Sequence, residues 1–232
     1  MTKTTKPNPL IELTITLIIP ALILMKLSAP EKLGAAGALV LALSFPLAWG
    51  VREFWLRRKL NLFAALGVIS TLLTGGIGLL ALDTRWLAVK EAAVPALIGL
   101  AVLGSTFTRY PLVRAMLLNP TVIDLARLQA QLEAHGATAA FEQRLLRATW
   151  MLSGTFFFSA AMNFFLATYI VVSPAGTAAF NEELGRLTLL SYPFIALPSM
   201  AMMGFVLYYL SRATRTLTGQ GFTEFLNTGE QT

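Results

Sequence analysis

The sequence predicts an all-α, polytopic integral membrane protein with six transmembrane helices in three hairpins and one cytoplasmic amphipathic helix. Three observations predict this class. Long apolar runs recur along the chain, each near the length that crosses a hydrocarbon core of roughly 30 Å as a helix. The 232 residues are 56% hydrophobic and only 13% charged, about half the charged fraction usual in soluble domains. Basic residues gather in alternate connections, as in membrane proteins with cytoplasmic loops.

The six apolar runs are separated by short turns or by polar connections. They cover residues 10–25, 33–51, 60–82, 86–108, 148–172 and 187–210. Proline, glycine, serine or aspartate punctuates the three expected outer turns, near residues 28–30, 83–84 and 173–176. Outside the runs roughly 100 residues remain, too few for a separate soluble domain of usual size. We therefore expect one membrane domain over residues 1–232.

The distribution of basic residues predicts the orientation of the chain. Of the 18 lysine and arginine residues, 13 lie on the side that holds the N-terminus, the connections after the second and fourth runs, and the C-terminal tail. An excess of basic residues marks the cytoplasmic side, so both termini are expected there. The net charge of +6 has this source and does not predict a nucleic-acid partner. Lys3 and Lys6 imitate a signal peptide, but we expect the first helix to stay uncleaved.

The long connection over residues 110–147 is expected to be a cytoplasmic helical insert. Asn119-Pro120-Thr121 is typical of a helix start, and Gly136 is typical of a helix end. Between them, apolar residues recur at three- and four-residue spacing, namely Val122, Leu125, Leu128 and Leu132. Such a helix lies on the membrane surface or packs under the bundle. A partner-binding helix is the alternative. A second helix, from residue 137, is expected to continue into the fifth run.

Two carboxylates inside the apolar runs are the first candidates for chemistry, because a charge in lipid costs several kcal/mol unless it is paired or hydrated. Glu12 shares a helical face with Pro20, and Glu91 shares one with Pro95. A carboxylate beside a proline-loosened backbone can line a polar cavity. The interpretation we favour is simpler. Both acids lie near run ends and reach the headgroups, and Lys90 forms an interfacial pair with Glu91.

The fifth run carries a polar stripe at strict four-residue spacing, which contains Thr155, Ser159 and Asn163. Asn163 lies near the expected middle of the bilayer, where its amide needs hydrogen-bond partners. The stripe is therefore expected to face other helices. Hydrogen bonding between helices is the favoured role, and the lining of a polar pathway is the alternative.

Small residues form a further stripe in the third run, at Gly67, Thr71 and Gly75. Small residues at this spacing permit close approach of two helix backbones, so we expect these three to pack against a neighbour and the third run to lie centrally. The glycine-rich segment 74–78 superficially suggests a phosphate-binding loop. It lacks the following Lys-Ser/Thr and lies within an apolar run, which excludes that interpretation.

The remaining residue types argue against enzymatic chemistry. The chain has no cysteine, which excludes disulfides, thiol catalysis and cysteine-based metal sites. Its one histidine, His135, lies in the long connection without clustered acids, so neither a metal site nor a Ser-His-Asp arrangement can be assembled. We expect a protein that is not an enzyme and needs no cofactor.

Three stretches of the chain resemble, in order, a known family. They are Arg57-Arg58-Lys59-Leu60-Asn61, then Tyr110-Pro111-Leu112-Val113-Arg114-Ala115-Met116-Leu117, then Ala148-Thr149-Trp150 with Ala161-Met162-Asn163-Phe164. In that order they resemble the bacterial intracellular septation protein A family of small inner-membrane proteins. A longer branch of uncharacterised bacterial membrane proteins is similar over most of the chain, including Asn8-Pro9-Leu10 and Lys90-Glu91-Ala92.

The resemblance implies a bacterial inner-membrane protein linked to envelope integrity, septation and envelope-synthesis partners, without a biochemical activity. The chain differs from the family in the extended cytoplasmic helix over residues 121–147 and in a longer outer turn around residues 181–186.

Two functions are expected from these observations. The first is a non-enzymatic inner-membrane protein that contributes to envelope organisation or septation. It would act within the lipid bilayer through contacts with other envelope or division membrane proteins, or with a second copy of itself. The alternative is a small-solute or ion transporter or channel, whose polar pathway would use Glu12, Glu91 and Asn163. A hydrated cavity at these residues favours transport, and a sealed interior favours the organising role.

Overall fold

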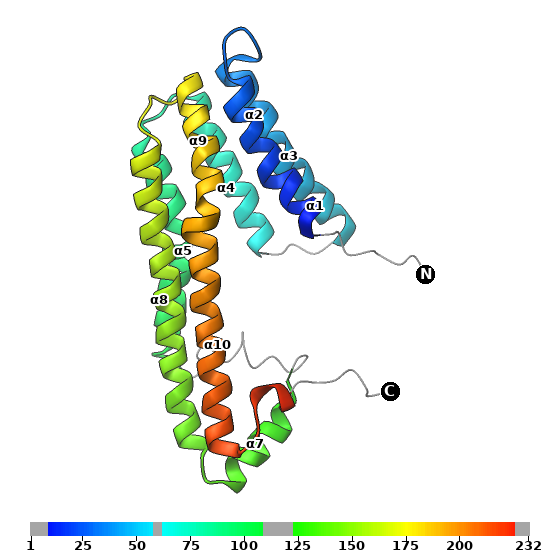
Figure 1. The fold of residues 1–232 in the computed structure, drawn as a ribbon, viewed down its shortest axis with the longest axis vertical. Helices are drawn as coiled ribbons and strands as arrows, with labels where there is room; N and C mark the ends of the chain where they lie inside the picture. Colours follow the sequence, from blue (N-terminus) through cyan, green and yellow to red (C-terminus); the bar gives the residue numbers. More distant parts are fainter. Residues whose placement is uncertain (1–8, 58–61, 109–122, 226–232) are drawn as a thin grey trace. The chain divides into compact units, whose positions relative to one another are not determined.

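The computed structural model describes residues 9–57, 62–108 and 123–225. These residues form helices joined by turns, which confirms the all-α prediction (Figure 1). The lysines at positions 3 and 6, the expected helix start at Asn119 and the family-like stretch 110–117 lie outside the described residues.

The helices of the described residues follow one another along the chain. In order they are α1 (Pro9–Leu13), η1 (Thr14–Ile18), α2 (Ile19–Leu27), α3 (Gly34–Arg57), α4 (Leu62–Leu79), α5 (Arg85–Ser105), α7 (Leu125–Ala134), α8 (Thr138–Ile170), α9 (Ala178–Ser191), η2 (Tyr192–Ala196), α10 (Leu197–Thr218) and η3 (Phe222–Phe225). Both η1 and η2 are single π-helical turns, and η3 is a 3₁₀ turn.

Four stretches of helix in the described part of the chain are long and apolar enough to cross a membrane. They are Gly34–Arg52, Arg85–Ser105, Thr138–Ile170 and Ala178–Thr218. In the apolar part of Gly34–Arg52 only 17% of the residues are buried within the protein. Most of its apolar side chains therefore need an apolar environment outside the chain, which is what a bilayer supplies.

The two π-helical turns both precede a proline near the start of the next helix, in α2 and in α10. Proline lacks an amide hydrogen and releases the carbonyl one turn earlier, so the helical hydrogen-bond ladder widens at that point. In η1 the backbone N–H of Ile19 bonds to the carbonyl of Thr14. The hydroxyl of Thr16 donates to the carbonyl of Glu12 at 2.8 Å.

The last helical stretch corrects one boundary. We expected an outer turn at residues 181–186 and a sixth run from residue 187, but α9 already begins at Ala178. Thr177 caps this helix, because its hydroxyl accepts the backbone N–H of Phe180 at 3.1 Å. Glu182 and Arg186 then form an ion pair one turn apart, at 2.6 Å. Polar residues that suggested a turn instead stabilise the first turns of a helix.

By its internal packing the chain divides into two compact units. Unit 1 comprises residues 1–94 and 161–195. Within it α2 packs against α9 and α3, and α3 also packs against α4. Its core contains the fully buried side chains of Leu39, Leu87 and Phe180. Gly78 lies close to the side chain of Leu39 of α3, and Gly185 lies close to the backbone of α2.

Unit 2 comprises residues 95–160 and 196–232. Its core contains Leu145, Leu152, Leu210 and Phe225. Asp124, rather than the expected Asn119 segment, caps α7, and its carboxylate accepts the N–H of Arg127 at 2.9 Å. Leu128 and Leu132, on the apolar face of α7, are buried in this core. After Gly136, which has a φ of +60°, α8 runs from Thr138 to Ile170 without a break.

Candidate functional site

The strongest candidate site is a lysine buried in the part of the apolar helix α5 that belongs to unit 1. The Nζ atom of Lys90 lies 2.7 Å from a carboxylate oxygen of Glu91. The Lys90 side chain is only 8% exposed, and the Glu91 side chain is 29% exposed. A charge at this depth requires compensation by partners, because desolvation of an ammonium costs several kcal/mol.

Two hydroxyl groups on α4 complete the surroundings of the Lys90 ammonium. Its Nζ donates to Thr74 Oγ1 at 2.8 Å and to Ser70 Oγ at 3.2 Å. Ser70 and Thr74 are four residues apart, so they lie on the same face of α4. With Glu91 as third acceptor, all three protons of the ammonium are used. The site therefore joins α4 to α5 and leaves the cation without a free donor.

A hollow of about 180 Å³ lies beside this lysine. Apart from Ser70 and Lys90, its lining is apolar and includes Leu66, Leu73 and Trp86. The lining supplies few groups that could hold water or an ion. Lys90 lays its aliphatic stem along this surface while its charged end reaches the hydroxyls and the carboxylate. The geometry is that of an internally paired ammonium whose carboxylate partner stays partly exposed.

The other predicted carboxylate differs from Glu91. The Glu12 side chain is exposed on α1, where its backbone carbonyl accepts the hydroxyl of Thr16. Glu12, Glu91 and Asn163 do not line the hollow beside Lys90, nor two others formed by described residues, one at Arg212 and one at Thr155.

The polar stripe of α8 is divided between the two units. Ser159 is half-buried in unit 2, and Asn163 is half-buried in unit 1. Thr155 is buried, and its hydroxyl donates within its own helix to the carbonyl of Met151 at 3.2 Å. A hydroxyl bond between helices comes from Ser153, which the stripe did not include. Ser153 is 1% exposed and donates to the carbonyl of Gly99 on α5 at 2.9 Å.

Of the small-residue stripe of α4, the Gly75 end packs against a neighbouring helix and, among the described residues, the Gly67 end does not. Gly75 is buried, and a Cβ atom added there would lie 2.9 Å from Leu43 of α3. Thr71 donates its hydroxyl to the carbonyl of Gly67 at 2.9 Å. Gly67 itself is exposed, and an added Cβ would meet no described atom within 4 Å.

A second buried polar cluster, which the sequence analysis did not identify, fastens the turn between α2 and α3. Asn181 of α9 is 1% exposed. Its Nδ2 donates to Ser28 Oγ at 3.0 Å and to the carbonyl of Ala35 at 2.7 Å, while its Oδ1 is buried without a partner among the described residues. The clue in the sequence was an asparagine four residues after the cap Thr177, inside a helix instead of a turn.

Replacing Asn181 by alanine is expected to lower the free energy of unfolding by about 1–2 kcal/mol. The change removes two buried hydrogen bonds and leaves a small cavity. Ser28→Ala, which removes one of the two acceptors, should cost less. The check is SDS-induced unfolding of both variants in mixed micelles, followed by tryptophan fluorescence. An Asn181→Ala protein as stable as the unsubstituted one would contradict this structural role.

Glu183 ties the start of α9 to the end of α8. Its carboxylate accepts the backbone N–H groups of Val172 at 3.0 Å and Ser173 at 2.8 Å, and the hydroxyl of Ser173 at 2.6 Å. These three donors give the carboxylate a structural role in the turn.

The described residues contain no group of three or more histidine, aspartate or glutamate side chains placed to hold a metal ion. The site as a whole brings together Lys90, Glu91, Ser70 and Thr74. The sequence predicts the pair of Lys90 and Glu91 but not the two hydroxyl partners. Comparison with protein-family models, with curated proteins and with solved structures finds no match, so the resemblance to the septation protein A family stays a prediction from the residues quoted above.

Proposed function

We propose that this chain is a non-enzymatic protein of the bacterial inner membrane that organises envelope or division proteins through lateral contacts within the bilayer. The observation that carries the proposal is the internal pairing of the Lys90 ammonium. A buried charge whose three protons all have internal acceptors holds two helices together. The Lys90 ammonium therefore has no free donor with which to bind a transported solute.

A transport pathway would require a different environment for the same residues. Ions and polar solutes cross a protein through hydrated cavities lined by groups that can exchange partners. The hollow beside Lys90 has an apolar lining apart from Ser70 and the lysine itself. Its lining comes from side chains of α4 and α5, and its volume is about 180 Å³.

The proposed topology has six spans with both termini in the cytoplasm. Beyond the four long stretches, the first helical segment covers residues 9–27, which is roughly 28 Å at 1.5 Å per residue. The helix Ala65–Leu79 is a shorter apolar element. The basic residues of the alternate connections support the cytoplasmic placement of both termini.

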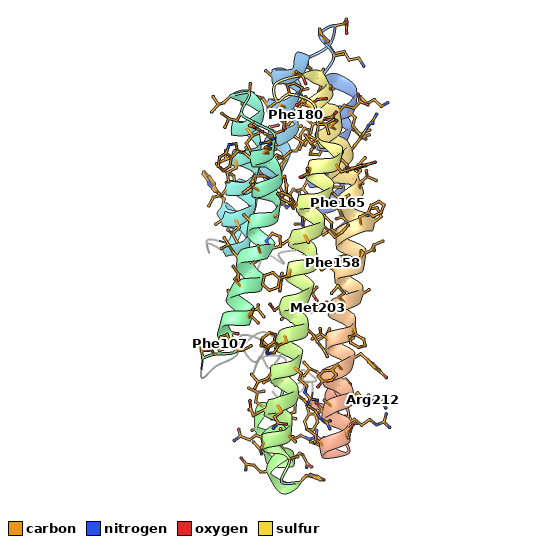
Figure 2. All side chains as sticks on the ribbon, turned by 90° about the vertical axis from the view of Figure 1, so that its left-hand side faces the viewer. Phe107, Phe158, Phe165, Phe180, Met203 and Arg212 are labelled. Atoms are coloured by element: carbon orange, nitrogen blue, oxygen red, sulfur yellow. The ribbon has the colours of Figure 1, made fainter. Side chains whose placement is uncertain are left out.

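Exposed aromatic side chains on α8 offer a surface for lateral contacts. Phe165 and Tyr169 are 59% and 76% exposed, and their rings stack with centroids 6.0 Å apart. Figure 2 labels Phe165 on this helix. Aromatic side chains contribute large contact areas with few rotatable bonds, so they are common anchors of protein interfaces.

The test is photo-crosslinking in living cells. A photoreactive amino acid replaces Phe165 in one strain, and in a control strain it replaces Leu166, which is 7% exposed on the same helix. We expect discrete adducts from position 165, identified by mass spectrometry as division or envelope-synthesis membrane proteins, and far weaker adducts from position 166. Depletion of the chain should then produce the same envelope defect as depletion of the adduct protein. Lipid adducts alone, or unmatched phenotypes, would contradict the proposal.

A further inference from the structure

A basic hollow lies on one face of α10 near its C-terminal end. It has a volume of about 360 Å³ and is lined by Tyr208, Ser211, Arg212, Arg215 and Thr216. These positions are three or four residues apart, so they share one face of the helix. The opposite face of the same turns is buried: Val206 and Leu210 belong to the core of unit 2, and Ala213 is 3% exposed.

Hydrogen-bond donors gather on the exposed face without acidic partners. Arg212 donates to the hydroxyl of Tyr208 at 3.3 Å, which leaves most of its guanidinium donors available. Within the described part of the chain, the side chain of Arg215 and the hydroxyl of Ser211 make no hydrogen bond or ion pair. Two cations and a free hydroxyl therefore point to an anionic ligand rather than to an internal ion pair.

The order of residues along α10 places this face at a membrane boundary. The helix continues the candidate span Ala178–Thr218. The apolar Phe205 and Leu207 are 59% and 42% exposed, Tyr208 follows at 57%, and the arginines come next. Apolar, then tyrosine, then arginine is the sequence of side chains that passes from the hydrocarbon core to the headgroup layer. Figure 2 shows Arg212 near this end of α10, directed away from α8.

We propose that this hollow binds the phosphate group of an anionic phospholipid in the cytoplasmic leaflet. Arg212 and Arg215 supply the charge and the paired N–H donors that fit phosphate oxygens. Ser211 supplies a hydroxyl donor, and Tyr208 orients Arg212 from the side nearer the hydrocarbon. Inorganic phosphate shares this chemistry. The phospholipid is favoured because the exposed apolar residues that precede the arginines provide contact for its acyl chains. This site is independent of the proposed lateral contacts, so either can fail without the other.

The experiment is native mass spectrometry of the full-length protein in detergent micelles. The protein is titrated with phosphatidylglycerol and, separately, with phosphatidylcholine of the same acyl chains. We expect retained adducts with phosphatidylglycerol at concentrations about tenfold below those needed for phosphatidylcholine. The preference should weaken as ionic strength rises, because salt screens interactions between exposed charges. Equal retention of the two lipids would overturn the proposal.

Three further arms identify the site and the source of the phosphate. The double variant R212Q/R215Q should lose at least tenfold in apparent affinity for phosphatidylglycerol. The control Arg147→Gln removes one arginine from an exposed position of α8, outside the hollow, and should stay within twofold of the unsubstituted protein. Unchanged binding by the double variant would overturn the assignment of the site. Full displacement of the lipid by millimolar inorganic phosphate would assign the site to free phosphate and overturn the lipid proposal.

Discussion

Replacing Glu91 by leucine is expected to lower the free energy of unfolding by about 2–4 kcal/mol. The substitution leaves the ammonium of Lys90, whose side chain is 8% exposed, with two neutral hydroxyl acceptors and no counter-charge. Removing one partner of a buried ion pair costs about 3–5 kcal/mol in soluble proteins. The partial exposure of Glu91, 29%, reduces the expected cost here. SDS-induced unfolding in mixed micelles measures the change.

A double substitution separates the buried charge from the loss of packing. Lys90→Met together with Glu91→Leu removes both charges and keeps similar side-chain volumes, so it should recover most of the stability lost in Glu91→Leu. Glu182→Gln is the control, because Glu182 and Arg186 form an ion pair whose side chains are 46% and 57% exposed. We expect that control to cost less than about 0.5 kcal/mol. If Glu91→Leu and Glu182→Gln were equally mild, the pair at Lys90 would contribute no more to stability than an exposed ion pair.

The pair also illustrates why the sequence predicted part of this site. Adjacent lysine and glutamate in an apolar run indicate an ion pair, whichever helix lies beside them. The two hydroxyls come from α4, and their contact with Lys90 depends on the rotation of α4 about its axis. The periodicity of α4 hardly specifies that rotation, because apolar residues surround the helix on all sides.

The fold, like the site, could be predicted only in part: the sequence predicts the helices but not their exact boundaries. Long apolar runs define helices, and helices joined by turns make up the described residues. Boundaries depended on local chemistry that the apolar pattern does not carry. Asp124 caps α7 and Thr177 caps α9. Aspartate and threonine are also common in turns, so these residue types alone do not mark a helix start. The interhelical hydroxyl bond from Ser153 was missed because four-residue spacing identifies a stripe without identifying which of its neighbours meets a partner.

Replacing Gly185 by alanine is expected to lower the free energy of unfolding by about 2–3 kcal/mol. Gly185 of α9 is buried against α2. A Cβ atom there would lie 2.7 Å from Met25 Cγ and 2.8 Å from the backbone oxygen of Ala21. The flexible Met25 side chain can move, but the Ala21 carbonyl belongs to the helix itself. The two helices must therefore separate, and loss of tight packing usually costs about 1–3 kcal/mol or somewhat more.

Gly204→Ala is the matched control, and its expected effect has the opposite sign. Gly204 is exposed within α10, and an added Cβ would meet no described atom within 4 Å. Alanine favours a helix interior over glycine by about 0.5–1 kcal/mol, so this variant should be slightly more stable than the unsubstituted protein. The same SDS titration measures both variants. If both glycines responded alike, helix propensity alone would explain the results. A loss at Gly185 beside a gain at Gly204 requires the close contact of α2 and α9.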